Sequence, residues 1–204
     1  MMKRLIATAA LATLVASPAF AQSYQYNPNE GPYIGAGLGY SKLDNDTLDW
    51  LGDVGASTDD SDTGYKLFVG YQFNPNFAVE AGYVDFGDFK ASGADGTDSA
   101  RLKLGMEGFT AALVGKLPIQ NGFSVFGKLG MVAWDADVDL DATIGGDVYR
   151  ESASEDGSDP YYGIGAEYEA ERILMRAEFE RYDISEDGED FEIDLISASI
   201  GYRF

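Results

Sequence analysis

The sequence predicts an all-β fold, an eight-stranded antiparallel up-and-down transmembrane β-barrel. Eight segments rich in Tyr, Phe, Val, Ile and Gly follow residue 30, most of them near the roughly 9–11 residues that a tilted strand needs to cross a bilayer. The connectors between these segments alternate between short and long. No apolar stripe with helical spacing persists, so the membrane-crossing elements are expected to be strands.

The first 21 residues are predicted to be a secretory signal peptide. Lys3 and Arg4 form a basic start, residues 5–15 are apolar, and Ala19-Phe20-Ala21 fits an A-x-A cleavage site. The alternative, a membrane anchor, is disfavoured because the apolar run is well short of about 20 residues. The mature barrel domain is therefore expected to span residues 22–204. Without Lys3 and Arg4 it has 12 basic and 35 acidic residues, a charge of −23.

The eight strands and their connectors follow in order. The predicted strands are 33–42, 65–74, 77–86, 102–117, 123–135, 161–169, 173–183 and 193–204. Three connectors are tight, at 75–76, 118–122 and 170–172, and the first two contain the turn formers Asn, Pro or Gly. Four are predicted to be long loops, at 43–64, 87–101, 136–160 and 184–192, and they hold most of the acidic residues. Short turns at one end and long loops at the other are typical of an outer-membrane barrel.

The two faces of the strands differ in character. In the first strand, Ile34, Ala36, Leu38 and Tyr40 alternate with glycines and a serine. In a small barrel surrounded by lipid, the apolar face points outward and the small or polar face points inward. The fourth segment fits less well, because its apolar residues change parity along the strand: Met106 is even-numbered, whereas Phe109 is odd-numbered. We expect a bulge near Glu107-Gly108 to reconcile the two halves.

Five charged residues lie in the middle of predicted strands, on the face opposite their apolar neighbours. They are Glu80, Lys128, Glu167, Arg176 and Glu178. Buried charges need partners, and side chains fill the interior of an eight-stranded barrel. The pattern therefore predicts an ion network across the lumen. The alternative is that these residues are solvated on an exposed sheet face.

Four segments together resemble the transmembrane domain of outer membrane protein A and its small-barrel relatives. They are GPYIGAGLGY at 31–40, VGYQFNP at 69–75, GIGAEY at 163–168 and IGYRF at 200–204. The resemblance runs through the whole mature chain. It implies periplasmic turns, extracellular loops and a charged plug at the five lumen residues. Gly37 and Val114 stand where the family has lysines, which predicts a network short of cations.

The resemblance also carries expectations about assembly and surroundings. Ile200, Tyr202 and Phe204 resemble the C-terminal signal that the barrel-assembly machinery reads; alternatively they are a plain lipid-facing strand end. The sequence ends directly after the eighth strand, so we expect no peptidoglycan-binding domain. The expected location is the bacterial outer membrane. Expected partners are outer-membrane lipid, lipopolysaccharide, the barrel-assembly machinery and periplasmic chaperones, with the barrel a monomer.

The composition excludes several kinds of chemistry. The chain has no His and no Cys, so a Ser-His-Asp triad, a His metal site and a disulfide scaffold are impossible. Its strong negative charge disfavours nucleic-acid binding. We expect no enzymatic activity and no cofactor. Asp135, Asp137, Asp139 and Asp141 are a weak candidate for a Ca²⁺ or Mg²⁺ site, but the EF-hand pattern fails at Leu140 and Gly146, and a solvated acidic loop is favoured.

Three functions agree with the sequence. The first is a structural protein that contributes to envelope integrity and displays acidic extracellular loops. The second is a small low-conductance pore, which Gly37 and Val114 would favour by loosening the plug. The third is a surface adhesin or host-interaction protein that works through the long loops.

Overall fold

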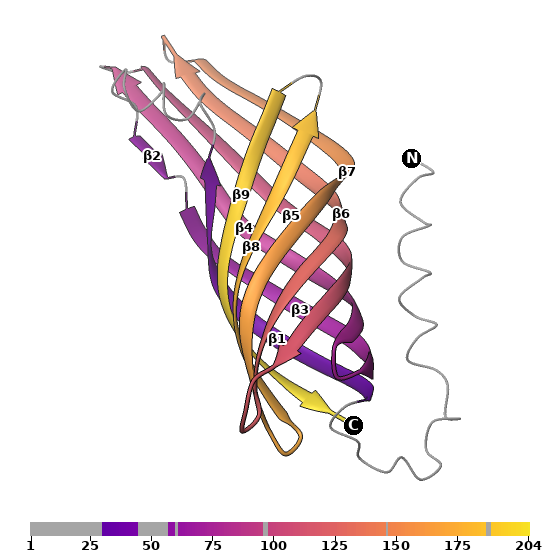
Figure 1. Ribbon diagram of the computed structural model, residues 1–204. Helices are drawn as coiled ribbons and strands as arrows, with labels where there is room; N and C mark the ends of the chain where they lie inside the picture. The colour runs from indigo at the N-terminus through magenta and orange to yellow at the C-terminus, as the bar shows by residue number, and fades with distance from the viewer. Residues whose placement is uncertain (1–29, 45–56, 60, 96–97, 146, 187–188) are drawn as a thin grey trace.

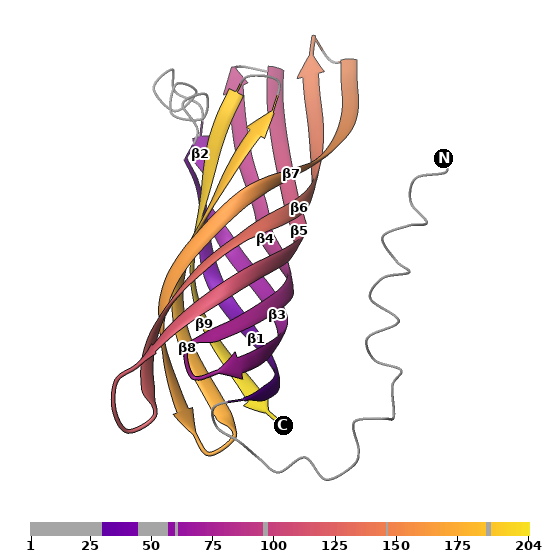
Figure 2. The same cartoon turned by 45° about the vertical axis from the view of Figure 1, so that its right-hand side comes forward.

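The chain folds into a closed, tilted β-barrel (Figures 1 and 2). The computed structural model describes residues 30–44, 57–59, 61–95, 98–145, 147–186 and 189–204. The predicted signal peptide, 1–21, lies outside these residues. The strands are β1 Gly31–Asp44, β2 Ser57–Asp59, β3 Ser61–Asn74, β4 Phe77–Asp95, β5 Asp98–Pro118, β6 Phe123–Ile144, β7 Asp147–Ala170, β8 Ile173–Glu186 and β9 Glu189–Arg203.

Eight of these strands form one antiparallel ring. Each pairs with the next in the order β1, β3, β4, β5, β6, β7, β8, β9, and β9 returns to pair with β1. The short β2 lies outside the ring and pairs with residues 90–92 near the end of β4. The predicted eight-stranded barrel is therefore confirmed. Among the described residues, no helix is long and apolar enough to cross a membrane.

The three tight turns lie together at the end of the barrel where the C-terminus also lies (Figure 1). In the first turn, the Asn74 side-chain oxygen accepts hydrogen bonds from the backbone N–H groups of Asn76 and Phe77, at 2.9 and 3.0 Å. The other two turns contain residues with positive φ, Asn121 at 53° and Glu171 at 55°. Short turns identify this as the periplasmic end.

Three of the four predicted long loops are wrong over most of their length, and most of the first, 43–64, lies outside the described residues. β4 and β5 stay paired up to Asp95↔Asp98, and β6 and β7 up to Ile144↔Asp147. β8 and β9 stay paired up to Glu186↔Glu189. The ladders continue because pairing satisfies the backbone groups, while the acidic side chains alternate outward into water. β4 to β7 thus extend as a sheet above the barrel (Figure 2).

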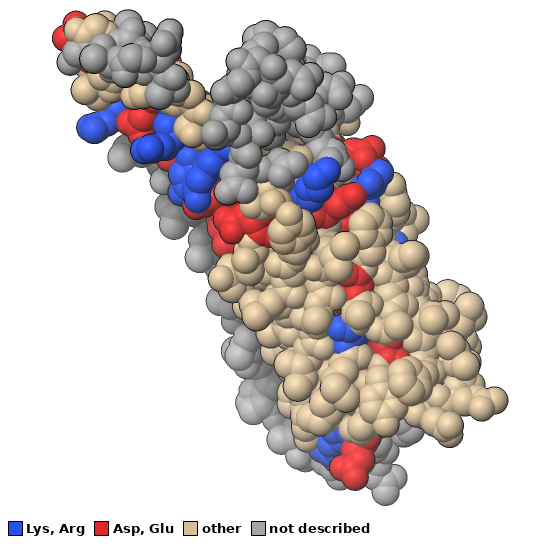
Figure 3. Space-filling model, turned by 90° about the vertical axis from the view of Figure 1, so that its left-hand side faces the viewer, with Lys and Arg blue, Asp and Glu red and all other residues tan. Residues whose placement is uncertain are grey.

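The lower part of the barrel has a largely apolar outer surface, the apolar wall (Figure 3). Outward-facing side chains include Ile34, Leu38, Leu67, Val69, Phe77, Phe109, Leu113, Leu117, Val125, Leu129, Met131, Ile164, Met175, Ile196 and Ile200, all exposed. On β6 the wall runs from Phe123 to Ala133, about 25 Å of outer-membrane hydrocarbon at the usual strand tilt. Aromatic pairs lie near both edges, Tyr83–Phe109 at 5.4 Å and Phe123–Tyr168 at 4.6 Å between ring centroids.

The mixed parity of the fourth predicted strand has another cause than the expected bulge. β5 pairs with β6 without interruption, so the break near Glu107-Gly108 is wrong. The irregularity lies on β4, where Phe86 and Gly87 intervene between Asp85 and Asp88, and Gly87 has φ +81°. Met106 points inward like the rest of the even-numbered residues of β5. It is apolar because the upper lumen has an apolar core.

Candidate functional site in the barrel lumen

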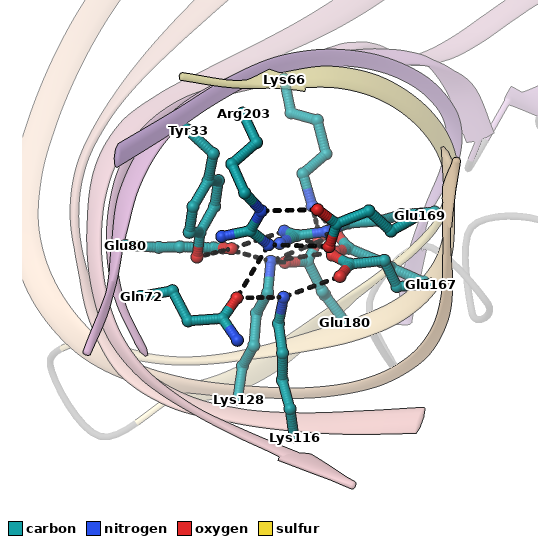
Figure 4. A network of polar contacts seen from close by, with 12 residues as sticks. Tyr33, Lys66, Gln72, Glu80, Lys116, Lys128, Glu167, Glu169, Glu180 and Arg203 are labelled. Atoms are coloured by element: carbon teal, nitrogen blue, oxygen red, sulfur yellow. Dashed lines mark hydrogen bonds and ion pairs between the residues drawn. The ribbon is translucent and has the colours of Figure 1, made fainter. Parts of the chain in front are cut away.

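The candidate site is the barrel lumen, where the sequence predicts a network of five charged side chains. In the part of the barrel that holds these residues, alternation directs even-numbered residues of β3 to β6 and β8 inward and odd-numbered residues of β7 inward. Glu80, Lys128, Glu167, Arg176 and Glu178 are all buried. The structure brings these five side chains together in the middle of the lumen (Figure 4).

Arg176 is the centre of the network. Its Nη1 lies 2.5 Å from Glu80 Oε1, and its Nε lies 2.5 Å from Glu167 Oε2. Nη1 also lies 3.6 Å from Glu178 Oε1. One guanidinium on β8 therefore joins carboxylates from β4, β7 and its own strand. Such charge-assisted hydrogen bonds are the strong ones.

Lys128 of β6 provides a second centre. Its Nζ lies 2.8 Å from Glu80 Oε2, 3.1 Å from Glu178 Oε1 and 3.5 Å from Glu180 Oε1. Glu80 thus receives a cation on each of its two oxygens. Because Lys128 and its partners come from three strands, β6, β4 and β8, the contacts cross-link the barrel through its interior.

Sequence reasoning missed several members of the network. Lys66 pairs with Glu178 and, at 2.5 Å, with Glu180. Nearer the periplasm, Lys116 Nζ lies 2.7 Å from Glu167 Oε1. The remaining members are Gln72, Glu169 and Arg203; Arg203 lies 2.8 Å from both Gln72 Oε1 and Glu169 Oε1. The same alternation that marked the first five marks Lys66, Lys116 and Glu180 as inward.

The charges of this network balance. Five cations, Lys66, Lys116, Lys128, Arg176 and Arg203, face five carboxylates, Glu80, Glu167, Glu169, Glu178 and Glu180. The expected shortage of cations is therefore wrong. Lys66 and Lys116 supply the positive charge from positions other than 37 and 114.

Aromatic rings surround the cations. The Arg176 guanidinium carbon lies 4.8, 5.1 and 5.2 Å from the ring centroids of Phe68, Tyr33 and Phe126. The Tyr33 hydroxyl donates a 2.8 Å hydrogen bond to Glu80. Cation–π contacts of this kind replace part of the hydration that a buried cation loses.

The two positions expected to loosen the plug do not do so. A Cβ at Gly37 would lie 2.2 Å from the Ser199 hydroxyl oxygen, so the space that a side chain would need is already filled. Val114 is fully buried in a lower apolar cluster. The members of that cluster are Tyr33, Phe68, Ala78, Val114, Phe126 and Leu174.

A second apolar cluster closes the lumen above the network. Tyr161 and Tyr182 stack with ring centroids 4.9 Å apart, and Phe86 packs edge-on against Tyr182 at 4.7 Å. Trp134 donates a 2.7 Å hydrogen bond to Asp159. The other buried members are Leu43, Val84, Phe89, Met106, Ala112, Val132, Ala136, Ile184, Ile193 and Leu195.

Little empty space remains inside the network. A void lined by Lys66, Glu80, Lys128, Glu180 and Tyr182, among others, measures about 10 Å³. That volume is near the minimum for one water molecule. Glu80, Glu178 and Glu180 are therefore enclosed, whereas Glu167 also lines a hollow of about 440 Å³ at the periplasmic end, together with Gln72, Lys116 and Glu169.

The other predicted sites lie outside the lumen. Ile200, Tyr202 and Phe204 point outward at the periplasmic end, and the rings of Tyr202 and Phe204 meet edge-on at 5.3 Å. Their outward position agrees with both readings of the C-terminal segment, an assembly signal and a lipid-facing strand end.

The candidate metal ligands Asp135, Asp137, Asp139 and Asp141 lie on β6, and the expectation that they belong to a loop is wrong. All four are exposed on its outward face. Among the described residues, no group of three or more acidic side chains is arranged to hold a metal ion. The pKa of Asp135 is raised by partial desolvation and by the neighbouring carboxylates of Asp156 and Glu107.

Three solved structures illustrate the similarity to known proteins. Ail, the attachment invasion locus protein of Yersinia pestis, is 21% identical, with a TM-score of 0.53 over 86% of this chain and 99% of that chain. Neisserial surface protein A is 12% identical, with a TM-score of 0.54 over 87% and 100%. OprG of Pseudomonas aeruginosa is 18% identical, with a TM-score of 0.50 over 86% and 97%. No curated protein matches the sequence.

These similarities show a shared barrel fold, and a family model extends the agreement to the sequence. The model of the outer membrane protein beta-barrel domain matches residues 7–204, which confirms the resemblance to small outer-membrane barrels and the predicted location. The chain therefore belongs to the outer membrane protein β-barrel family and resides in the bacterial outer membrane.

Proposed function

We propose that this protein is a sealed, non-enzymatic structural barrel that contributes to the integrity of the outer membrane. The lumen carries the proposal: a charge-balanced ion network packs among the rings of the lower apolar cluster, the upper apolar cluster covers it, and the void beside Lys66, Glu80 and Lys128 measures about 10 Å³. A hydrated ion needs more space than that. Above the membrane, β4 to β7 present a paired sheet to the exterior.

The experiment compares a strain that lacks the protein with the same strain carrying the wild type. We expect the deletion to increase entry of an apolar fluorescent dye through the outer membrane, and the wild-type gene to restore the barrier. Heat-modifiable migration on a gel reports that the restored protein is folded. Equal dye entry in both strains would contradict the structural role.

A small pore is the alternative that the sealed lumen argues against. Refolded protein in planar bilayers is expected to give no steady unitary current at any voltage that the bilayer tolerates. Reproducible conductance steps from folded, heat-modifiable protein would show that the plug opens.

A surface adhesin is a second candidate, supported by the tip of the β6–β7 hairpin. Val148 and Tyr149 are 61% and 56% exposed there, unusual for apolar side chains in water. Ail is by its name an attachment protein, but at 21% identity the likeness shows only the fold. Replacing residues 140–151 by an Asn-Gly turn keeps the pair Asp139↔Ser152. An adhesin would lose cell binding, and binding that survives would rule out this hairpin.

Export and assembly belong to the same proposal. Residues 1–21 would direct secretion, chaperones would hold the periplasmic chain, and Ile200, Tyr202 and Phe204 would form the signal for the barrel-assembly machinery. The outward, exposed position of all three side chains on the last strand supports this role. Removing Phe204 is expected to lower the amount of folded barrel in the outer membrane, whereas Ile119→Ala in a periplasmic turn is expected to leave it unchanged.

We further propose that the barrel works as a monomer in contact with outer-membrane lipid and lipopolysaccharide. Within the membrane the ring closes β1 against β9, so no strand edge is left for another copy. The apolar wall meets the acyl chains. Chemical cross-linking in membranes is expected to give no dimer band.

A further inference from the structure

The outward face of β4 to β7 continues above the apolar wall as two rows of opposite charge. The acidic row, Asp85, Glu107, Asp135 and Asp156, follows directly above the wall, with each residue opposite the next across neighbouring strands. The basic row, Lys90, Arg101, Lys103 and Arg150, lies higher on the same face. Figure 3 shows Lys and Arg side chains gathered at this level of the molecule.

Strand pairing holds the basic row together. Lys90 lies opposite Lys103, and Lys103 opposite Asp139. One rung higher, Arg101 lies opposite Asp141, which in turn lies opposite Arg150. Asp88, Asp137, Asp139 and Asp141 stand on the same face at this level, so the four cations make it neutral, in contrast to the acidic row below and to the net charge of −21 of the whole chain.

These cations are available to a ligand. Lys103 Nζ lies 3.0 Å from Asp88, and Arg150 Nε lies 3.0 Å from Asp141, but all of these side chains are 38–80% exposed. Exposed ion pairs contribute little to stability, so a ligand anion can replace the carboxylates at small cost. Arg101 forms no ion pair with any described residue. A hollow of about 540 Å³ adjoins Arg101, Lys103 and Arg150, and the carboxylates of Asp139, Asp141 and Glu151 also line it.

The height of the basic row selects the kind of anion. Lys103 stands six residues beyond Phe109 on β5, and Asp139 six residues beyond Ala133 on β6, about 20 Å along each strand. At the usual tilt this is roughly 15 Å above the apolar wall. Phospholipid headgroups extend only about 5–8 Å beyond the hydrocarbon. The phosphate of a phospholipid headgroup is therefore too low to reach the basic row, whereas a phosphate on a tall sugar headgroup reaches this height.

We propose that the basic row binds phosphate groups on the sugar headgroup of a lipopolysaccharide molecule whose acyl chains lie against the apolar wall below. The basic row and the wall are on the same outward face of the same strands, so one molecule can contact both. The acidic row repels phosphates close to the membrane and leaves the higher row as the direct contact. This site rests on the proposed contact with lipopolysaccharide and assigns residues to it.

The test measures binding of purified lipopolysaccharide to the full-length barrel in detergent micelles with EDTA, which removes bridging divalent cations. The quadruple variant Lys90→Gln, Arg101→Gln, Lys103→Gln, Arg150→Gln is expected to bind at least tenfold more weakly, and Arg101→Gln alone roughly fivefold more weakly. The control is Arg181→Gln, which removes a cation of β8 that is paired with Asp194 of β9. This variant is expected to bind like the wild type. Heat-modifiable migration checks that each variant is folded.

Ligand controls separate the possible sources of anion. Dephosphorylated lipopolysaccharide is expected to bind as weakly to the wild type as the intact molecule binds to the quadruple variant. Phosphatidylglycerol is expected to bind wild type and quadruple variant equally. A wild type that binds no lipopolysaccharide would overturn both the site and the proposed partner. Binding that the quadruple substitution leaves unchanged would overturn the site alone.

Discussion

The two faces of strand β6 exchange their character between its lower and upper halves. The lower half is apolar on its outward face and charged on its inward face, and the upper half is the reverse. In the lower half, Lys128 points into the lumen at 6% exposure and Leu129 points outward at 66%. In the upper half, Trp134 points inward at 2% exposure and Asp135 points outward. The backbone and its alternation are the same throughout. The solvent around the strand decides the pattern, because lipid requires an apolar outer face and water does not.

This exchange of apolar and charged faces between the two halves, the reversal, also explains how the lumen is closed. Within the membrane most apolar residues lie on the outside, and the interior is filled by charges that neutralise one another, packed among the rings of the lower apolar cluster. Above the membrane the strands behave as an ordinary soluble sheet, and their apolar residues form the core that covers the network.

The largest expected effect comes from removing the central cation of the lower region. Arg176→Met leaves Glu80 and Glu167 without their shared partner in a closed interior, and we expect the free energy of unfolding to fall by ~3–5 kcal/mol. Urea unfolding in lipid vesicles measures it. Lys103→Met, at an exposed ion pair, is the control, with an expected loss below ~1 kcal/mol. Equal losses would mean that the lumen charges are solvated.

The next effect compares the same substitution on the two halves of β6. Leu129→Arg places a charge on the apolar wall and is expected to cost ~2–4 kcal/mol of unfolding free energy in vesicles. Asp137→Arg, on the same face above the wall, is expected to change the value by less than ~0.5 kcal/mol. Similar costs at both positions would contradict the boundary placed near Asp135.

A smaller effect tests the packing of the lumen against that of the wall. A Cβ at Gly70 would lie 2.2 Å from Tyr33 Cζ, so Gly70→Ala must displace the ring that supports Glu80. Overpacking of this kind typically costs ~1–3 kcal/mol. The matched control is Gly115→Ala on the outward face, where a Cβ would meet no described atom within 4 Å. The urea midpoint of unfolding measures both variants. A midpoint equal to that of the wild type for Gly70→Ala as well as for Gly115→Ala would contradict a filled lumen.

The smallest effect concerns pH and the upper region alone. The pKa of Asp135 is raised in the folded protein by partial desolvation and by Asp156 and Glu107. Between the unfolded and the raised value, the folded state binds more protons, so stability falls as pH rises through this window. Asp135→Asn is expected to flatten this slope in the pH range directly above the ordinary aspartate pKa of about 3.9. Urea midpoints measured across that range check it; an unchanged slope would remove Asp135 as the cause.

The sequence contained enough information for the ring of strands and the three tight turns. The apolar alternation of residues such as Leu38 and Ile200 marks every membrane-crossing segment, and Asn74-Pro75-Asn76 marks a turn. The strand continuations above the membrane were missed. There, the outward residues include Asp, Gly and Lys, which have low β-propensity, and tertiary pairing overrides that preference.

The lumen was predictable in part, for a related reason. Parity within one strand identifies which residues point inward, and it identified Glu80, Lys128 and Arg176. Parity does not reveal which inward residues meet. Lys66 and Glu178 are 112 positions apart, and only the stagger of the closed barrel brings them to one level.

The reversal along β6 is tested most directly by measuring, for each residue of the strand, whether its side chain is accessible to lipid or to water. The chain has no Cys, so single cysteines along β6 can each carry a nitroxide spin label. Odd-numbered positions from Phe123 to Ala133 are expected to be accessible to oxygen in the lipid, and those from Asp135 upward to an aqueous nickel chelate. Even-numbered positions from Phe126 to Trp134 are expected to be accessible to neither. Nickel accessibility at Lys128 and its even-numbered neighbours would contradict the sealed lumen.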